Sequence, residues 1–356
     1  MHSIIKAFEP SIFSHSLGDH SVHDLKTKVR AAAMAGFKAI EISTIDLNHH
    51  HITTKSSNYS ILDSAREIGD LCKSFRIKVL CLQPLRDVVE AKNTNQAVEA
   101  AASMFPIMDA LRTDLLLCCS SSLSPDLITE DFNQVVKNLT AIGEAAMTHK
   151  GSPKRIAFEA LSWGTFINTW AQAWRVVEAV NLSNVGLCLD SFNTLAREWA
   201  DPTLEGGVQP EANEKILISL LMLREVPGSK IFFLQLADGR RLPEPIPEGT
   251  FEAPALMTWS RSSRLFPFEL DLGGYLPVIN FVRAVLKTGY QGPLSVEVFN
   301  SSLFIDNAKI PGEHARRGFS SLALLKELLG MNSSIKFGRE ININHSNILH
   351  QESFVN

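Results

Sequence analysis

Four apolar segments of this chain each end in a side chain that carries an oxygen atom. The segments are RIAFE at 155–159, VGLCLD at 185–190, KIFFLQ at 230–235 and GPLSVE at 292–297. Continuous apolar runs without alternation are typical of strands that are covered on both faces. An isolated buried charge costs on the order of several kcal/mol unless it is paired. Glu159, Asp190, Gln235 and Glu297 therefore indicate a polar site, because packing alone would not favour them.

Apolar strand-like segments alternate with helix-like segments along most of the chain. Besides the four strands above, we expect strands over 7–14, 37–42, 77–82 and 114–119. The helices expected between and after the strands cover 22–36, 60–75, 95–111, 130–149, 169–180, 211–225 and 277–289. Eight strands that alternate with these seven helices predict an α/β fold of the (β/α)8 TIM-barrel type. An open doubly wound sheet is the competing fold, but the chain has no Gly-rich phosphate loop of the kind that favours it.

We predict one catalytic domain over residues 1–330, followed by a polar C-terminal tail over 331–356 that is rich in Asn, Ser and His. Within the domain, the connection between the seventh strand and the seventh helix is exceptionally long and covers 239–276. Long connections in compact domains are commonly functional or disordered. This one carries Arg261 and Arg264 beside aromatic residues, so we interpret it as a lid or wall over the site.

Composition excludes several classes of partner. The formal charge is −4, so nothing favours nucleic acid or an anionic membrane surface. The apolar runs are far shorter than a membrane span, and the N-terminal residues resemble no signal peptide. The five cysteines lie in apolar or helix-like segments without zinc-ligand spacing, which is typical of reduced core thiols. We expect a cytoplasmic protein that binds a small molecule; whether it is a homo-oligomer is left open.

In a TIM barrel the carboxyl ends of the strands meet at one face, where active sites lie. Glu159, Asp190, Gln235 and Glu297 would come from the fifth to eighth strands and share one mouth. Three carboxylates this close repel one another and raise one another's pKa, and a divalent cation removes that penalty. Oxygen ligands favour Mg²⁺ or Mn²⁺, with Co²⁺ or Zn²⁺ also compatible. For each residue alone, a salt bridge or a helix cap is the alternative.

From about residue 16 to 328 the chain resembles the xylose-isomerase-like (sugar phosphate isomerase/epimerase) barrels, and among them the fungal 3-dehydroshikimate dehydratases. The resemblance is carried by the following segments: SLG at 16–18, GFKAIE at 36–41, CLQP at 81–84, EALSW at 159–163, GLCLDSFN at 186–193, WSR at 259–261, RLF at 264–266, GYLPV at 274–278 and EVFN at 297–300. The resemblance implies that Glu159, Asp190, Gln235 and Glu297 are the metal ligands, and that the reaction removes water from 3-dehydroshikimate to give protocatechuate.

The chain departs from these dehydratases where they recognise substrate. Ile45 stands where an acidic residue is usual, DVVEA at 87–91 replaces a Tyr-Asp/Glu-Gly segment, and Phe166 replaces a basic residue. After the last strand, Ser301 and Ser302 stand where two arginines are expected. The predicted site is therefore more apolar than that of its relatives, which leaves open whether dehydroshikimate still binds.

Several further residues are candidates for substrate binding: Gln83, Arg86, Trp163, Asn193, Arg261 and Asn300. Arg86 suits a bidentate carboxylate contact, although a surface salt bridge explains it equally well. Asn193 stands where many barrel relatives have His, so we expect it to bind substrate or water. The general base is unknown; His20 and His23 follow the first strand and are weak candidates, with surface or helix-start positions as the alternative. His49, His50 and His51 are interpreted as a solvated loop.

We therefore predict a divalent-metal-dependent lyase that resembles 3-dehydroshikimate dehydratase and that is re-specified toward a more apolar secondary-metabolite substrate. Two alternatives remain. One is a metal-dependent isomerase or epimerase of a hydroxy-ketone, which forms the same enolate and returns the proton. The other is a barrel without catalytic activity that binds a ligand.

Overall fold

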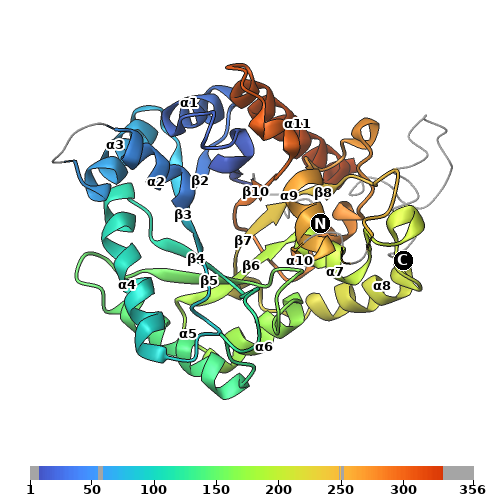
Figure 1. Cartoon of the computed structure of the whole chain (residues 1–356), viewed down its shortest axis with the longest axis horizontal. Helices are drawn as coiled ribbons and strands as arrows, with labels where there is room; N and C mark the ends of the chain where they lie inside the picture. Colours follow the sequence, from blue (N-terminus) through green and yellow to red (C-terminus); the bar gives the residue numbers. More distant parts are fainter. Residues whose placement is uncertain (1–7, 55–58, 248, 250–251, 332–356) are drawn as a thin grey trace.

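Eight parallel strands close into a barrel, in the order β1-β10-β7-β6-β5-β4-β3-β2 (Figure 1). The computed structural model describes residues 8–54, 59–247, 249 and 252–331. The barrel strands are β1 (Pro10–Phe13), β2 (Ala39–Ser43), β3 (Lys78–Leu85), β4 (Leu115–Cys119), β5 (Arg155–Glu159), β6 (Val185–Asp190), β7 (Ile231–Leu236) and β10 (Leu294–Val296). The fold expected from the sequence is confirmed.

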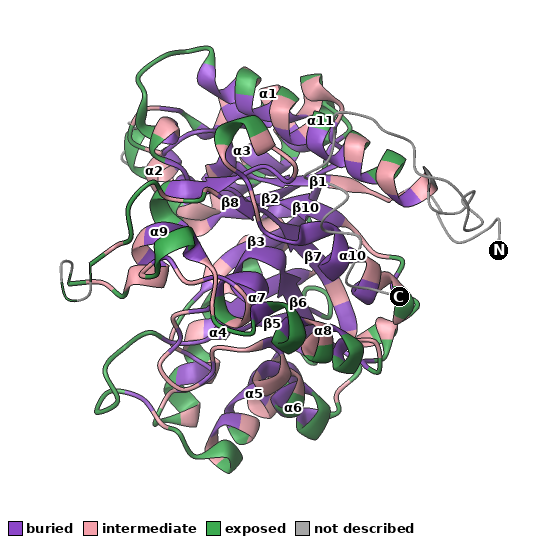
Figure 2. Ribbon diagram, turned by 90° about the vertical axis from the view of Figure 1, so that its right-hand side faces the viewer, coloured by how far each residue is buried: buried purple, intermediate pink, exposed green. Residues whose placement is uncertain are grey.

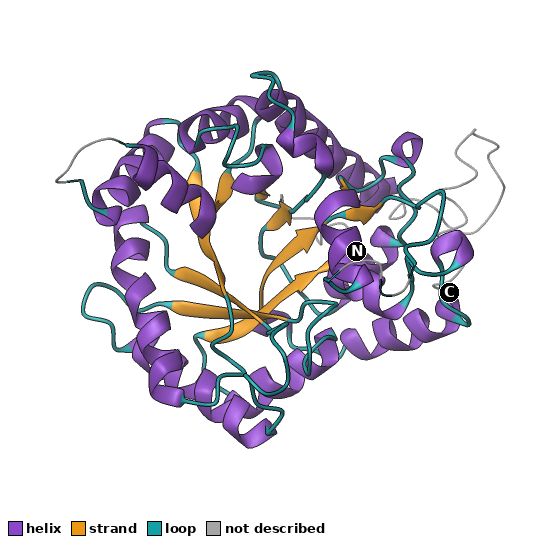
Figure 3. Cartoon of the chain, viewed as in Figure 1, coloured by secondary structure: helices purple, strands orange, loops and turns teal. Residues whose placement is uncertain are grey.

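Helices surround the barrel in a ring (Figure 3). They are α1 (Leu25–Ala35), α2 (Thr44–Thr53), α3 (Ile61–Ser74), α4 (Thr94–Leu111), α5 (Phe132–Met147), α6 (Trp170–Val180), α7 (Ser191–Glu198), α8 (Ala212–Leu223), α9 (Ala255–Ser263), α10 (Val278–Lys287) and α11 (Ile310–Met331). Short 3-10 turns lie at Ser14–Leu17 (η1), Glu205–Gly207 (η2), Gly228–Lys230 (η3), Leu270–Leu272 (η4) and Ser301–Phe304 (η5). Side-chain caps start several helices; Ser60 and Thr169 both form capping boxes.

The strands are buried on both faces, which explains their unbroken apolar sequences (Figure 2). Apolar side chains of mixed size fill the interior, including Ala39, Leu117 and Phe233. A larger apolar layer packs between the strands and the helices. The last helix closes the ring against the first, where the rings of Phe37 and Phe319 meet edge to face with centroids 5.5 Å apart. Among the described residues, no helix combines the length and the apolar character needed to cross a bilayer.

The histidine tract does not form a loop, and that expectation is wrong. Residues 49–51 lie in α2, a helix that starts where the Ser43 hydroxyl accepts hydrogen bonds from the amides of Ile45 and Asp46. Leu47 is buried, and His50 is buried and contacts the carboxylate of Glu67 at 2.9 Å. A cap and an apolar contact thus favour the helix over the polar loop suggested by composition.

Three further helices were not expected. Helix α7 starts directly after Asp190, whose side chain caps it; α9 lies inside the long 239–276 connection; and α11 follows the last strand. Within that connection, β8 (Asp238–Gly239) and β9 (Arg264–Leu265) pair antiparallel. The expected first strand is shorter than predicted, and residue 7 lies outside the described residues, as does the predicted tail beyond residue 331.

Candidate metal centre and substrate pocket

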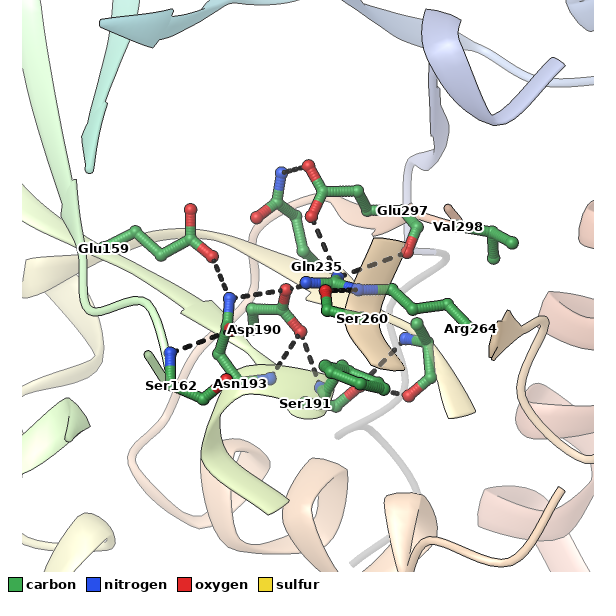
Figure 4. A network of polar contacts seen from close by, with 12 residues as sticks. Glu159, Ser162, Asp190, Ser191, Asn193, Gln235, Ser260, Arg264, Glu297 and Val298 are labelled. Atoms are coloured by element: carbon green, nitrogen blue, oxygen red, sulfur yellow. Dashed lines mark hydrogen bonds and ion pairs between the residues drawn. The ribbon is translucent and has the colours of Figure 1, made fainter. Parts of the chain in front are cut away.

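The polar strand tips gather at the carboxyl end of the barrel (Figure 4). In register, Asp190 pairs with Gln235 across β6 and β7, and Cys119 pairs with Glu159 across β4 and β5. Glu297 follows β10 directly. Carboxylate oxygens of Glu159, Asp190 and Glu297 all lie within 4.8 Å of one another, and all three residues are buried. Parallel strands therefore bring together three oxygen donors from distant parts of the chain.

Two carboxamides connect Glu297 to a further buried carboxylate, Glu41 on β2. Gln235 Nε2 lies 2.9 Å from both Glu41 Oε2 and Glu297 Oε1, and Gln83 Nε2 lies 2.8 and 3.0 Å from the same two oxygens. The amide oxygen of Gln235 faces the Cys188 thiol instead, at 3.2 Å. A half-turn of the amide would present that oxygen to the carboxylates.

Glu41 belongs to the site although it was not among the expected site residues. It is fully buried, and its Oε1 has no hydrogen-bond partner among the described residues. The sequence did carry a signal, because Glu41 lies near the end of an apolar strand just as the four predicted ligands do.

Asn193 holds two of the carboxylates in place. Its Nδ2 donates to Glu159 Oε1 at 2.8 Å and to Asp190 Oδ2 at 3.1 Å, while its Oδ1 accepts from the Ser162 amide at 3.0 Å. Asp190 is fixed further by its cap role, because its Oδ1 accepts from the amide of Phe192 at 2.6 Å. Asn193 thus orients these two carboxylates and does not line the pocket.

Arg264 is the cation that the structure places inside this cluster. Its Nη1 lies 2.7 Å from Asp190 Oδ2 and 3.0 Å from Glu297 Oε2, and its side chain is 1% exposed. The guanidinium lies over the rings of Phe192 and Phe299, 4.4 and 5.2 Å from their centroids. Such a buried cation compensates one negative charge, and the two rings add cation–π contacts to its ion pairs.

One guanidinium does not balance the carboxylates. Burial raises the pKa of Glu159 to about 8, and repulsion from Asp190 adds to that rise. Burial also raises the pKa of Glu297 well above its ordinary value and that of Glu41 to about 7. Oxygen donors with uncompensated negative charge fit a hard divalent cation, which would hold Glu159, Asp190 and Glu297 in their ionised forms.

A pocket opens beside the carboxylates, with about 590 Å³ of space including its opening to solvent. Its polar lining residues are His15, Ser43, Gln83, Arg86, Cys119, Glu159, Ser260, Arg261, Arg264 and Glu297, and its apolar ones are Phe13, Ile45, Pro84, Leu161, Trp163 and Phe299. Ser260, Arg261 and Arg264 come from the end of α9 and the residue after it, so the 239–276 connection forms one wall.

Two exposed arginines in this pocket have no carboxylate partner. Within the described residues, neither Arg86 nor Arg261 forms an ion pair or a hydrogen bond through its side chain. Burial lowers the pKa of Arg261, and the nearby Arg86 lowers it further. Two neighbouring cations without a counterion are suited to binding an anionic group.

The remaining expected residues divide between the pocket and its support. Gln83 and Trp163 line the pocket. Asn300 does not: its Nδ2 donates to the backbone carbonyl of Arg264 at 2.9 Å. His20 is half-buried beside Asp19, at 3.4 Å, and His23 Nε2 lies 3.1 Å from the carbonyl of Ile305; neither lines the pocket.

Of the residues that depart from the dehydratase pattern, some line the pocket and others lie outside it. Ile45 lines the pocket and is 49% exposed. Phe166 and Ser302 lie elsewhere: the Phe166 carbonyl accepts from Gln172, and the Ser302 hydroxyl contacts His314. The Ser121 hydroxyl donates a hydrogen bond to Asp87 Oδ1, which stabilises the loop after β3. Ile45 is therefore the departure that changes the pocket surface directly.

The chain is similar in sequence to one protein family and to several 3-dehydroshikimate dehydratases. The family described as xylose isomerase-like TIM barrel matches residues 29–325. A 3-dehydroshikimate dehydratase of Neurospora crassa is 32% identical over 336 residues, which cover 88% of this chain and 92% of that protein. A 3-dehydroshikimate dehydratase of Pseudomonas aeruginosa is also 32% identical over 85% of this chain, but the chain spans only 40% of its length.

Solved structures agree on the fold. A xylose isomerase-like TIM barrel/4-hydroxyphenylpyruvate dioxygenase fusion protein superposes with a TM-score of 0.71 at 30% identity, covering 94% of this chain and 46% of that one. The IolI protein, solved with a bound zinc atom, superposes with a TM-score of 0.66 at 19% identity, covering 89% of this chain and 97% of that one.

Proposed function

Because this chain belongs to the xylose isomerase-like TIM barrel family and is related over most of its length to 3-dehydroshikimate dehydratases, we propose that it is a metal-dependent dehydratase of a cyclic hydroxy-ketone acid, with 3-dehydroshikimate as the first substrate to test. The observation that supports this proposal most strongly is that one pocket contains both a candidate metal site and a candidate anion-binding site. Three clustered carboxylates suit a divalent cation, and two unpaired arginines suit a carboxylate group.

Glu159, Asp190 and Glu297 would hold the cation, with Gln235 as a fourth ligand once its amide oxygen is turned toward them. Mn²⁺ or Mg²⁺ suits this oxygen set best, and Co²⁺ or Zn²⁺ is compatible. When bound, the cation would act as a Lewis acid toward the substrate ketone, which acidifies the neighbouring C–H group.

The chain's own residues bind and orient the substrate. Arg86 and Arg261 would receive the carboxylate of the substrate, and Trp163 and Phe299 supply apolar surface beside its ring. Asn193 and Arg264 keep the carboxylate ligands in one geometry through hydrogen bonds. A proton must leave the carbon next to the ketone and a hydroxyl must leave the next carbon, which requires a group that exchanges protons.

The arginine pair favours this reaction over the alternative isomerase or epimerase of a neutral hydroxy-ketone, because a neutral sugar would leave both cations without an anion. Exposed Ile45 in the pocket supports a substrate with an apolar substituent, such as a secondary metabolite built on the same ring. A cytoplasmic location is supported by the five cysteines, all of which are free and buried.

The test is a direct absorbance assay. Metal-loaded protein is mixed with 3-dehydroshikimate and the aromatic product is followed in the ultraviolet, with EDTA-treated protein and the Glu159→Gln variant as controls. We expect aromatic product with the loaded protein alone. Bound metal without any aromatic product would contradict the dehydratase proposal and favour the isomerase or the binding barrel.

A further inference from the structure

The pocket offers few groups that can move a proton. Of its lining residues in the described part of the chain, Glu159 and Glu297 belong to the metal cluster, and the arginines stay charged. Burial raises the pKa of the Cys119 thiol well above its ordinary value, and this thiol faces Glu159 Oε2 at 3.4 Å. A neutral thiol of this kind is no base at neutral pH. The titratable group that remains is His15.

His15 is the second residue after the first barrel strand and lies in the short turn η1. Its side chain is 14% exposed, and its ring packs against Phe299, with centroids 5.1 Å apart, and against Phe13 at 6.1 Å. Its side chain makes no hydrogen bond to the described residues. The ring is therefore held by aromatic neighbours from two strand ends, it lines the pocket, and no described residue hydrogen-bonds its nitrogens.

Several charged or titratable groups that do not line the pocket lie close to His15. His15 Nδ1 lies 3.9 Å from Asp19 Oδ2, and His20 lies beside the same carboxylate. Asp46, on α2, is paired with the buried Lys28 of α1 at 2.6 Å, so its charge is largely compensated. Burial lowers the pKa of His15, and this effect outweighs the opposing influence of the two aspartates. The imidazole is therefore neutral, and able to accept a proton, at pH 7.

We propose that His15 is the catalytic base and acid of this barrel, a role that rests on the proposed dehydratase function. Its imidazole accepts the proton from the carbon next to the substrate ketone, and the C–H electron pair forms the enolate. As the enolate electrons form the new C=C bond, the C–O bond at the next carbon breaks, and the hydroxyl leaves as water with the proton returned by the imidazolium. No oxidant or reductant is needed.

The experiment compares His15→Gln and His15→Ala with wild-type protein and with His149→Gln. His149 is a matched control because it lies between α5 and β5, at the opposite end of the barrel, paired with Asp109. Each protein is loaded with Mn²⁺, its metal content and melting temperature are measured, and kcat and kcat/KM for 3-dehydroshikimate are recorded from pH 5 to 9.

We expect His15→Gln to keep one metal ion per chain and to lose about 10²- to 10⁴-fold in kcat, the usual contribution of a general acid–base residue. The acidic limb of the kcat/KM profile should disappear, and added imidazole should restore activity to His15→Ala, while His149→Gln behaves as wild type. His15→Gln with wild-type kcat and an unchanged pH profile would overturn the assignment. So would loss of a metal ion from His15→Gln, which would instead assign His15, with His20 and Asp46, to a cation site. Wild-type protein that gives no aromatic product would refute the proposed function itself.

Discussion

Replacing Arg264 by methionine removes the guanidinium that bridges Asp190 and Glu297. Methionine keeps much of the apolar volume between Phe192 and Phe299 but leaves both carboxylates without their partner. Removing one member of a fully buried ion pair costs about 3–5 kcal/mol. For 356 residues the entropy of unfolding is roughly 0.75 kcal/mol per kelvin, so the metal-free variant should melt about 4–7 °C below wild type.

The assay is thermal unfolding followed by circular dichroism, first in EDTA and then with excess Mn²⁺. Because a divalent cation supplies the missing positive charge, Mn²⁺ should recover at least half of the lost melting temperature. Arg317→Met is the matched control: Arg317 also lies over an aromatic ring and pairs with Glu269, but its side chain is 33% exposed. Its loss should cost about 1 kcal/mol or less. If Arg264→Met has the same melting temperature as wild type in EDTA, the carboxylate cluster does not carry the negative charge that we assign to it.

Three further outcomes follow from the same contacts. Asn193→Ala should weaken Mn²⁺ binding about 10- to 100-fold by calorimetric titration, because Glu159 and Asp190 lose their shared donor; unchanged affinity would contradict this. Arg86→Met and Arg261→Met should each raise KM for 3-dehydroshikimate about 10- to 100-fold with a smaller change in kcat, since each removes a charge-assisted hydrogen bond; an unaltered KM would exclude a carboxylate contact. Burial lowers the pKa of His314 from 6.5 to about 4. Between these two pH values the imidazole is protonated in the unfolded chain but not in the folded one. The free energy of unfolding should therefore fall by about 3 kcal/mol as the pH drops from 6.5 to 4. Stabilities from urea unfolding should show this loss in wild type, and a loss smaller by about that amount in His314→Gln; equal losses in the two proteins would contradict the assignment.

The local pattern of the sequence was sufficient to predict the barrel fold and the polar residues at the ends of its strands. Unbroken apolar runs ending in Glu159, Asp190 and Glu297 place these residues at one end of a parallel barrel, and the structure brings them within reach of one cation. Glu41 lies near the end of a similar run, one residue before its last apolar residue Ile42, so the same reasoning extends to it. Its role was missed because no local feature indicates that Gln83 and Gln235 both point at its carboxylate.

Contacts between distant segments could not be predicted in this way. Arg264 reaches Asp190 across 74 positions of sequence, by way of a connection that carries its own helix. His15 owes its place in the pocket to the turn after β1 and to Phe299 near the other end of the chain. The helix over the histidine tract depends on the Ser43 cap and on tertiary contacts of Leu47 and His50, which composition alone does not reveal.

An anomalous difference map from crystals soaked in Mn²⁺ tests the central claim most directly. We predict a single strong peak in contact with carboxylate oxygens of Glu159, Asp190 and Glu297, beside the pocket that Arg86 and Arg261 line. A map with no peak there, and with Arg264 still bridging Asp190 and Glu297 as the sole cation, would contradict the account.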